Sequence, residues 1–121
     1  MANLRSHLLF SYGTLRQDDV QRALFGRLVE GQPDAVKGYV LSTVRIDDPD
    51  VVAKSGSAVH PIMVATGDPA DEIEGMVFTI SDSDLAAVDR YETAAYRRVE
   101  ARLRSGRRAW AYEEADRSDE L

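Results

Sequence analysis

Few residue types in this sequence are suited to chemistry. The chain has no cysteine, which excludes thiol nucleophiles, disulfides, iron–sulfur clusters and cysteine-bound zinc. Its two histidines, His7 and His60, lie 53 positions apart, so a metal site would need an unusual shell made of carboxylates. We therefore expect no bound metal and no cofactor. Any catalysis would use carboxylates, hydroxyls, His60 or backbone amides.

Glu92 is the sharpest candidate for a catalytic group. Residues 84–92 have the composition of a helix, and successive helical residues lie about 100° apart around the axis. With Leu85 at 0°, Val88 falls at about 300° and Glu92 at about 340°, which places Glu92 on the apolar stripe. A carboxylate there either reaches solvent from the helix end or lies in a partly buried pocket, where desolvation raises its pKa. Asp89, at about 40°, has the same ambiguity and is also a candidate cap for a neighbouring loop.

The segment Tyr12-Gly13-Thr14-Leu15-Arg16 is a second candidate, between an expected strand and an expected helix. Glycine permits a sharp turn, and consecutive N–H groups near a helix N-terminus can bind a carboxylate or a developing oxyanion. The segment lacks the glycine spacing of a P-loop or of a dinucleotide-binding motif. An ordinary strand-to-helix turn would have the same residues.

The elements that must position these residues are mostly strands. We expect helices at 18–25, ending at Gly26, and at 84–92, with Ser81 or Ser83 as alternative N-caps. Strands are expected at 7–11, 36–46, 61–65, 73–80, 96–103 and 109–113, with a long excursion over 47–60 that contains at most one short strand. Most connections are too short for parallel crossovers. The sequence predicts a single α+β domain over 1–121, a small and mostly antiparallel β-barrel flanked by helices, with a flexible tail at 114–121.

Charge and hydropathy narrow the classes of partner. The chain carries 15 basic and 21 acidic residues, a net charge of −6, which disfavours binding to nucleic-acid phosphates. No run of about 18 apolar residues is present, and the first apolar run is too short for a signal peptide. We expect a cytoplasmic protein that binds neither nucleic acid nor membranes. The oligomeric state does not follow from the sequence.

Four motifs follow one another over residues 8–112, nearly the whole chain. They are Phe10-Ser11-Tyr12-Gly13-Thr14-Leu15-Arg16, Glu74-Gly75-Met76-Val77-Phe78, Val88-Asp89-Arg90-Tyr91-Glu92 and Tyr96-Arg97-Arg98. In this order and spacing they resemble the γ-glutamylcyclotransferase-like family, also called AIG2-like. The resemblance implies a small β-barrel flanked by helices, with a cavity lined by the Tyr-Gly-Thr-Leu loop.

The resemblance also implies a mechanism. In active family members the glutamate that matches Glu92 is the general acid/base. It takes a proton from the substrate's α-ammonium, the freed amine attacks the γ-carbonyl, and the ring closes to 5-oxoproline. The amides of Gly13, Thr14 and Leu15 would hold the substrate carboxylate or the oxyanion. Tyr12 and Tyr96 would bound the pocket, with the Tyr96 hydroxyl offered to the same group.

The expected ligand is a small γ-glutamyl amine or peptide, or, in the alternative of a non-catalytic protein, a small anionic metabolite in the same cavity. Residues 17–20 lack the Gly and Asn frequent in the γ-glutamylamine branch, and Thr93 stands where Gly is frequent, so the substrate is left open. Residues 55–61 resemble the variable loop that shapes substrate choice, and His60 there is either a packing residue or a second proton carrier.

Six arginines are crowded into the predicted C-terminal hairpin: Arg97, Arg98, Arg102, Arg104, Arg107 and Arg108. They either steer an anionic substrate or form a solvated strand face balanced by Glu100, Glu113 and Glu114. We favour the solvated face.

Overall fold

The computed structural model describes residues 6–45, 49–50, 53, 59–92 and 95–115. The named elements follow one another in this order: β1 (Ser6–Ser11), the 3-10 helix η1 (Thr14–Arg16), α1 (Asp18–Phe25), β2 (Gly31–Lys37), β3 (Tyr39–Arg45), β4 (Val59–Ala65), β5 (Glu72–Ser81), α3 (Asp82–Tyr91), β6 (Tyr96–Arg102) and β7 (Arg108–Glu114). The predicted excursion over 47–60 and the predicted tail after Glu114 lie largely outside the described residues.

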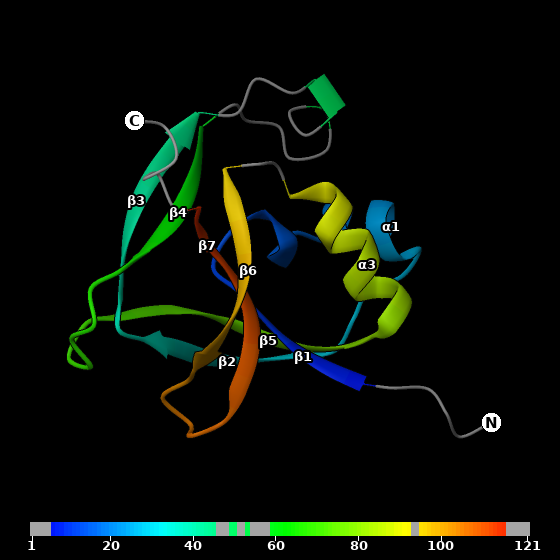
Figure 1. The fold of residues 1–121 in the computed structure, drawn as a ribbon. Helices are drawn as coiled ribbons and strands as arrows, with labels where there is room; N and C mark the ends of the chain where they lie inside the picture. The colour runs from blue at the N-terminus through cyan, green and yellow to red at the C-terminus, as the bar shows by residue number, and fades with distance from the viewer. Residues whose placement is uncertain (1–5, 46–48, 51–52, 54–58, 93–94, 116–121) are drawn as a thin grey trace.

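The strands form one strongly curved sheet with mixed pairing. Its order is β2-β5-β1-β7-β4-β3, and β6 pairs with β7. Pairs β1–β5, β2–β5, β3–β4 and β6–β7 are antiparallel, whereas β7 runs parallel to β1 and β4. A bridge between Val36 and Leu103 returns the chain after β6 to β2, so the sheet is nearly a closed barrel (Figure 1). The predicted barrel with helices is confirmed, and the two parallel pairings are the part not foreseen.

The predicted strand at 36–46 was wrong in its extent. Gly38 has a φ of 88°, a left-handed conformation that favours glycine, and it separates β2 from β3. Its N–H donates to the Asp71 carbonyl at 2.8 Å, and its carbonyl accepts from the Thr66 N–H at 2.8 Å. These bonds hold the β2–β3 corner against the β4–β5 connection.

Helices α1 and α3 lie on the same side of the barrel (Figure 1). Helix α1 ends as predicted, at Gly26, whose φ is 73°. Helix α3 begins two residues earlier than predicted, because Ser81 and Asp84 form a reciprocal capping box. Ser81 is therefore the N-cap of α3, and Glu92 follows its last residue as the C-cap.

Two apolar clusters use opposite faces of the same strands. On β1, Leu9 points to a cluster shared with α1 and α3, whereas Phe10 points to a cluster inside the barrel. This alternation follows from the two-residue period of a strand. The helices therefore cover one outer wall of the barrel, and the end of α3 is fixed beside β1 and β7.

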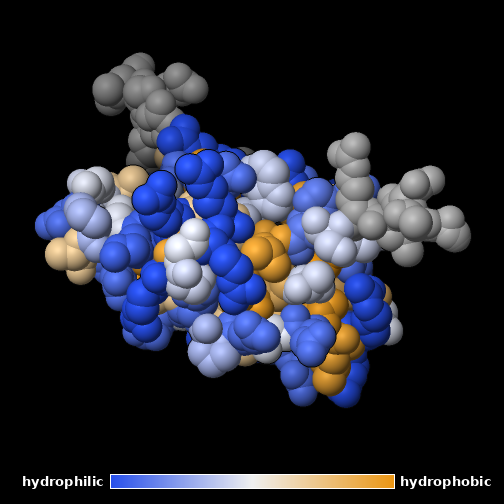
Figure 2. Space-filling view, turned by 90° about the horizontal axis from the view of Figure 1, so that it is seen from below, coloured by the Kyte–Doolittle hydropathy of each residue, from blue (hydrophilic) through white to orange (hydrophobic). Residues whose placement is uncertain are grey.

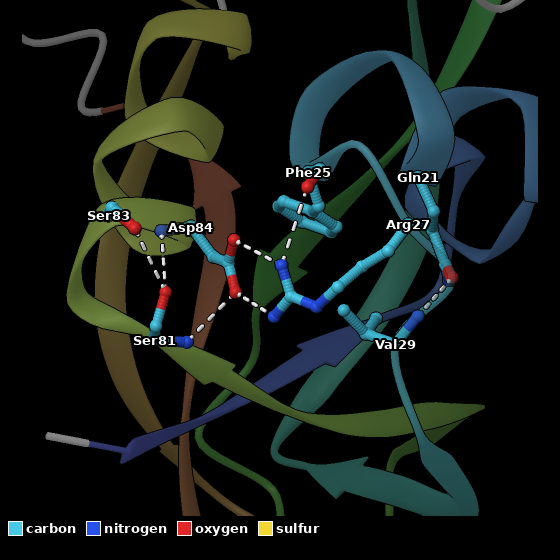
Figure 3. A network of polar contacts seen from close by, with 7 residues as sticks. All are labelled: Gln21, Phe25, Arg27, Val29, Ser81, Ser83 and Asp84. Atoms are coloured by element: carbon cyan, nitrogen blue, oxygen red, sulfur yellow. Dashed lines mark hydrogen bonds and ion pairs between the residues drawn. The ribbon is translucent and has the colours of Figure 1, made fainter. Parts of the chain in front are cut away.

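A polar network joins the chain around α1 to the start of α3 (Figure 3). Arg27 donates two hydrogen bonds to the buried Asp84 carboxylate. The buried Gln21 amide donates to the Leu15 carbonyl at 2.9 Å and accepts from the Val29 N–H at 3.1 Å. The network therefore ties η1, α1 and α3 into one unit.

The surface is mostly hydrophilic, with smaller apolar areas between the polar residues on the face in Figure 2. The large apolar side chains exposed in the described part of the chain are Leu28, Val40, Leu41 and Val59. Within the same residues, no helix is long and apolar enough to cross a membrane.

Candidate active site

A pocket lies where the β1–η1 loop, the end of α3 and strands β4, β6 and β7 meet. Every residue predicted for the site lines it: Tyr12, Gly13, Thr14, Leu15, Glu92 and Tyr96. His60 also lines the pocket, buried on β4 and not in a loop. The other lining residues are Phe10, Ser11, Pro61, Tyr91 and Tyr112. Segments far apart in the sequence thus contribute to one concave surface.

Glu92 faces this pocket. As the C-cap of α3 it is held by its own N–H, which donates to the Val88 carbonyl at 2.9 Å. Desolvation by burial raises the pKa of its carboxyl from 4.5 to about 8. No basic side chain among the described residues forms an ion pair with it. Of the two placements that the sequence left open for Glu92, solvent or a partly buried pocket, the structure shows the pocket. A carboxyl with this pKa both accepts and donates protons near neutral pH.

The Tyr-Gly-Thr-Leu loop presents backbone N–H groups at the start of η1. The carbonyls of Gly13 and Thr14 accept from the N–H groups of Arg16 and Gln17, and the Gly13 N–H makes a long contact of 3.3 Å with the Ser11 hydroxyl. The N–H groups of Thr14 and Leu15 have no hydrogen-bond partner in the described part of the chain. Two donors are thus free to meet an anion.

One side-chain contact joins this loop to the end of α3. The Thr14 and Tyr91 hydroxyls lie 3.0 Å apart, and Tyr91 immediately precedes Glu92. The Leu15 carbonyl is held from the other side by Gln21. The free amides and the Glu92 carboxyl therefore belong to one fixed arrangement.

Four of the five tyrosines of the chain line the pocket. The Tyr12 hydroxyl donates to the Tyr112 carbonyl at 2.6 Å and accepts from the Met63 N–H at 3.0 Å. The Tyr96 hydroxyl donates to the Pro61 carbonyl at 2.8 Å, so its hydrogen is not free for a substrate group. Burial, and then the charge of Glu92, raises the pKa of Tyr96, so this phenol remains protonated.

Asp89 has a structural partner instead of a place in the pocket lining. Its carboxylate accepts a hydrogen bond from the Tyr112 hydroxyl and forms an ion pair with Arg98, with 3.2 Å between Nη1 and Oδ2. The Arg98 guanidinium also lies over the Trp110 ring, 4.6 Å from its centroid. Asp89 therefore joins α3 to β6 and β7.

The arginines of the hairpin mostly face carboxylates, as the favoured interpretation expects. Arg97 donates to Glu113 at 2.6 Å, and Arg104 bonds to Glu72 and Glu74. None of the six hairpin arginines lines the pocket. Steering of a substrate by this hairpin has no support from its contacts.

Tyr91 and Tyr112 are two of the pocket residues that the sequence analysis did not assign to the site. Tyr91 lies within the motif that contains Glu92, so its position in that motif was an available signal. Tyr112 had none, because its place depends on the pairing of β7 with β1 and β4. The described residues hold no group of three or more acidic or histidine side chains that would bind a metal ion.

Residues 9–120 match the family model described as gamma-glutamyl cyclotransferase, AIG2-like, so the chain belongs to this family. No curated protein matches it in sequence.

Several solved structures share the fold. A solution structure from Arabidopsis thaliana is 22% identical, with a TM-score of 0.70 over 94% of this chain and 67% of its own. A structure described as a gamma-glutamyl cyclotransferase is 14% identical, with a TM-score of 0.67 over 93% of this chain and 68% of its own. A uropathogenic E. coli-specific protein is 16% identical, with a TM-score of 0.65 over 93% and 81%. These identities support the fold alone.

Proposed function

We propose that this protein cyclises the γ-glutamyl group of a small amine or peptide to 5-oxoproline, with Glu92 as general acid/base. The observation that carries the proposal is a desolvated carboxyl that faces the same pocket as the free N–H groups of Thr14 and Leu15. Membership of the gamma-glutamyl cyclotransferase family supports the reaction class. We also propose a cytoplasmic location, which the lack of cysteine supports.

The raised pKa suits the first proton transfer. An ordinary glutamate, with a pKa of about 4.3, is a weak base toward an α-ammonium, whose pKa is about 8 in peptides. Glu92, with a pKa of about 8, makes the transfer from that ammonium far less unfavourable in free energy. The same group, once protonated, is acidic enough to return the proton later.

The bond changes then follow in order. The freed α-amine attacks the γ-carbonyl carbon of the same glutamyl group, and the new C–N bond closes a five-membered ring. Protonated Glu92 gives its proton to the leaving nitrogen, and the original amide C–N bond breaks. The carboxylate of Glu92 then takes the second proton from the ring nitrogen and passes it to the departing amine, so that 5-oxoproline and an ammonium product leave. The amides of Gly13, Thr14 and Leu15 would hold the α-carboxylate or the oxyanion, while Tyr12 and Tyr96 bound the pocket.

Because nucleophile and electrophile belong to one molecule, most of the rate gain comes from holding the reactive conformer. The site needs no cofactor for this. A shaped pocket, a tuned carboxyl and a few fixed donors are sufficient.

A non-catalytic role as a binding protein for a small anionic metabolite is the second candidate. The free N–H groups of Thr14 and Leu15 favour it, since they would bind a carboxylate without any reaction. The two candidates differ in what Glu92 does, because anion binding does not need a carboxyl able to exchange a proton.

Release of 5-oxoproline from a panel of γ-glutamyl amines and peptides tests the proposal. Wild type should be active on at least one compound, and Glu92→Gln should lower kcat by about 10²–10⁴-fold. Glu30→Gln, at an exposed carboxylate outside this pocket, is the matched control and should keep full activity. Equal activity of wild type and Glu92→Gln would refute the acid/base role. A panel without any release, but with binding of small anions, would establish the second candidate.

A further inference from the structure

The hydroxyls of Tyr96 and Tyr112 have already given their hydrogens to partners in the protein. Tyr96 donates to the Pro61 carbonyl, and Tyr112 donates to the Asp89 carboxylate. Both directions are forced, since a carbonyl and a carboxylate only accept. A phenol has one hydrogen, so each oxygen has only lone pairs left for a ligand.

Both residues line the pocket together with Glu92. The negative charge of Glu92 raises the pKa of both tyrosines, so both phenols lie within electrostatic reach of its carboxyl. For Tyr96 this effect comes after burial, and for Tyr112 it comes after burial and after the hydrogen bond and charge of Asp89. The pocket lining therefore contains three oxygen acceptors, from Glu92 at the C-cap of α3, from β6 and from β7. Hydrogen-bond donors, in contrast, are found at the Tyr-Gly-Thr-Leu loop, where Thr14 and Leu15 offer free N–H groups.

Tyr12 differs from these two tyrosines, although it also lines the pocket. Its oxygen already accepts the Met63 N–H and donates to the Tyr112 carbonyl. Because its hydroxyl is bonded to a backbone N–H and to a backbone carbonyl, Tyr12 stabilises the barrel.

An ammonium group carries three N–H donors and no acceptor, which matches three acceptors without an intervening cation. We infer that the oxygens of Tyr96 and Tyr112, together with the Glu92 carboxyl, form a subsite that selects ligands with a free α-ammonium group. In this subsite Asp89 is a positioning residue, which holds the Tyr112 hydrogen away from the pocket. The inference rests on the proposed function only in taking the ligand to be a glutamyl compound.

The subsite would discriminate between ligands mainly through the oxygen acceptors that a poor ligand leaves without a hydrogen-bond partner. A ligand without the ammonium would desolvate three acceptors and satisfy none of them, which is unfavourable in a partly buried site. A ligand carboxylate or carbonyl at this end would place its own lone pairs against the lone pairs of the subsite oxygens, which is repulsive. Selection of a free amine would thus precede the chemical step.

A binding experiment tests this without any turnover. L-glutamate and glutarate differ by the α-ammonium group, and neither has a leaving amine. Calorimetric titration of the full chain should give a Kd for glutarate at least about tenfold weaker than that for L-glutamate. Tyr96→Phe and Tyr112→Phe should each weaken L-glutamate binding by about five- to tenfold and change glutarate binding little. Tyr39→Phe, at the one tyrosine outside the pocket, should leave both unchanged.

The Asp89→Ala variant tests whether Asp89 orients the Tyr112 hydroxyl or only supports the local structure. The freed Tyr112 hydroxyl would be able to turn its hydrogen to the pocket, so glutarate should bind more tightly and the ratio of the two Kd values should fall. A loss of affinity that is equal for both ligands would show structural support only and overturn the role of Asp89. Thermal unfolding of each variant checks that it is folded.

Failure of the subsite and failure of the reaction are distinct outcomes. If 5-oxoproline is released but L-glutamate and glutarate bind equally, the subsite is refuted and the reaction stands. If no compound is cyclised but the ratio is large and depends on Tyr96 and Tyr112, the subsite stands and the reaction is refuted. Tighter binding of glutarate than of L-glutamate by wild type would also refute the subsite.

Discussion

Arg27 and Asp84 are joined by two parallel hydrogen bonds, from Nη1 to Oδ1 at 3.1 Å and from Nη2 to Oδ2 at 2.6 Å. Asp84 is buried, and the same carboxylate accepts the Ser81 N–H in the capping box of α3. The pair thus connects the chain after α1 to the first turn of α3. Because Glu92 follows the last turn of that helix, the pair also helps to fix where the candidate catalytic carboxyl lies.

Asp84→Asn should lower stability at neutral pH and lose this effect in acid. Burial alone would raise the pKa of Asp84, but hydrogen bonds from Arg27 and Ser81 outweigh it and hold the pKa below its ordinary value. The folded state therefore favours the ionised form. Its contribution is present above the unfolded pKa of about 3.9 and is lost as pH falls through the lower folded value.

Urea unfolding of wild type and Asp84→Asn should differ by about 2 kcal/mol at pH 7 and converge near pH 2 to 3. Asp19→Asn, at an exposed acid in α1, is the control and should have a small effect. A difference that stays constant across this range would show that the ion pair is not its source.

Activity should rise with pH through the pKa of Glu92. The free enzyme needs the ionised carboxylate as base, and burial raises the pKa of that group to about 8. We expect log kcat/KM to increase with unit slope below about pH 8 and to stop rising above it, where the substrate's α-ammonium also loses its proton. Initial rates of 5-oxoproline release between pH 5.5 and 9.5 measure this. A profile already flat above pH 5.5 would mean that the base is not a desolvated carboxyl.

Local signals predicted much of this molecule from the sequence. The bounds of α1, the glycine that ends it and the hairpin of β6 and β7 depend on neighbouring residues, and these were correct. The choice between Ser81 and Ser83 had a local signal, since Asp84 lies three residues after Ser81 as a capping box requires, whereas the bond from Arg27 to Asp84 spans 57 positions. The parallel pairing of β7 with β1 and β4 is equally long-range.

The site residues likewise divide into those that local motifs predicted and those that depend on long-range contacts. The motifs were sufficient to select Glu92 and the Tyr-Gly-Thr-Leu loop, and both line the pocket. Helix geometry alone was not sufficient to decide whether Glu92 meets water or protein, because that depends on β6, β7 and the loop that close around it. Tyr112 was missed for the same reason.

Glu92→Gln should stabilise the protein while it removes activity. The pKa of Glu92 is about 8 in the folded state and 4.5 as the ordinary value, so folding disfavours the charged form. Wild-type stability should therefore fall as pH rises from about 4.5 to 8, and a neutral glutamine escapes this loss. The gain for the variant should approach about 5 kcal/mol above pH 8 and vanish near pH 4.

Thermal unfolding at pH 4, 6 and 8.5 tests this, with Glu30→Gln as the exposed counterpart. A variant less stable than wild type at pH 8.5 would contradict the desolvation of Glu92.

Tyr12→Phe should weaken the barrel where β4 and β7 run side by side. The hydroxyl links the Met63 N–H to the Tyr112 carbonyl, and its loss leaves two buried backbone groups with one partner fewer. We expect a loss of about 2–3 kcal/mol in the free energy of unfolding. Tyr96→Phe removes a bond to one carbonyl only, that of Pro61, and should cost about 1 kcal/mol. Equal losses in denaturant unfolding would argue against the bridging role of Tyr12.

Gly75→Ala should damage the fold next to the pocket, because β1 and β5 approach too closely there for a side chain. A Cβ at this position would lie 2.7 Å from Cζ of Phe10 and closer still to the Ser11 carbonyl oxygen. The backbone of β1 cannot move away without disturbing the Tyr-Gly-Thr-Leu loop that follows it. We expect a loss of about 2–4 kcal/mol in unfolding free energy.

Gly13→Ala is the matched comparison for this substitution. Its Cβ would meet only Cγ of Pro61, at 3.4 Å, which is an ordinary contact. This variant should unfold within about 1 kcal/mol of wild type. Its added methyl group lies at the pocket wall, so KM should rise while the fold is kept. If Gly75→Ala proves as stable as Gly13→Ala, the close approach of β1 and β5 is not what positions the loop.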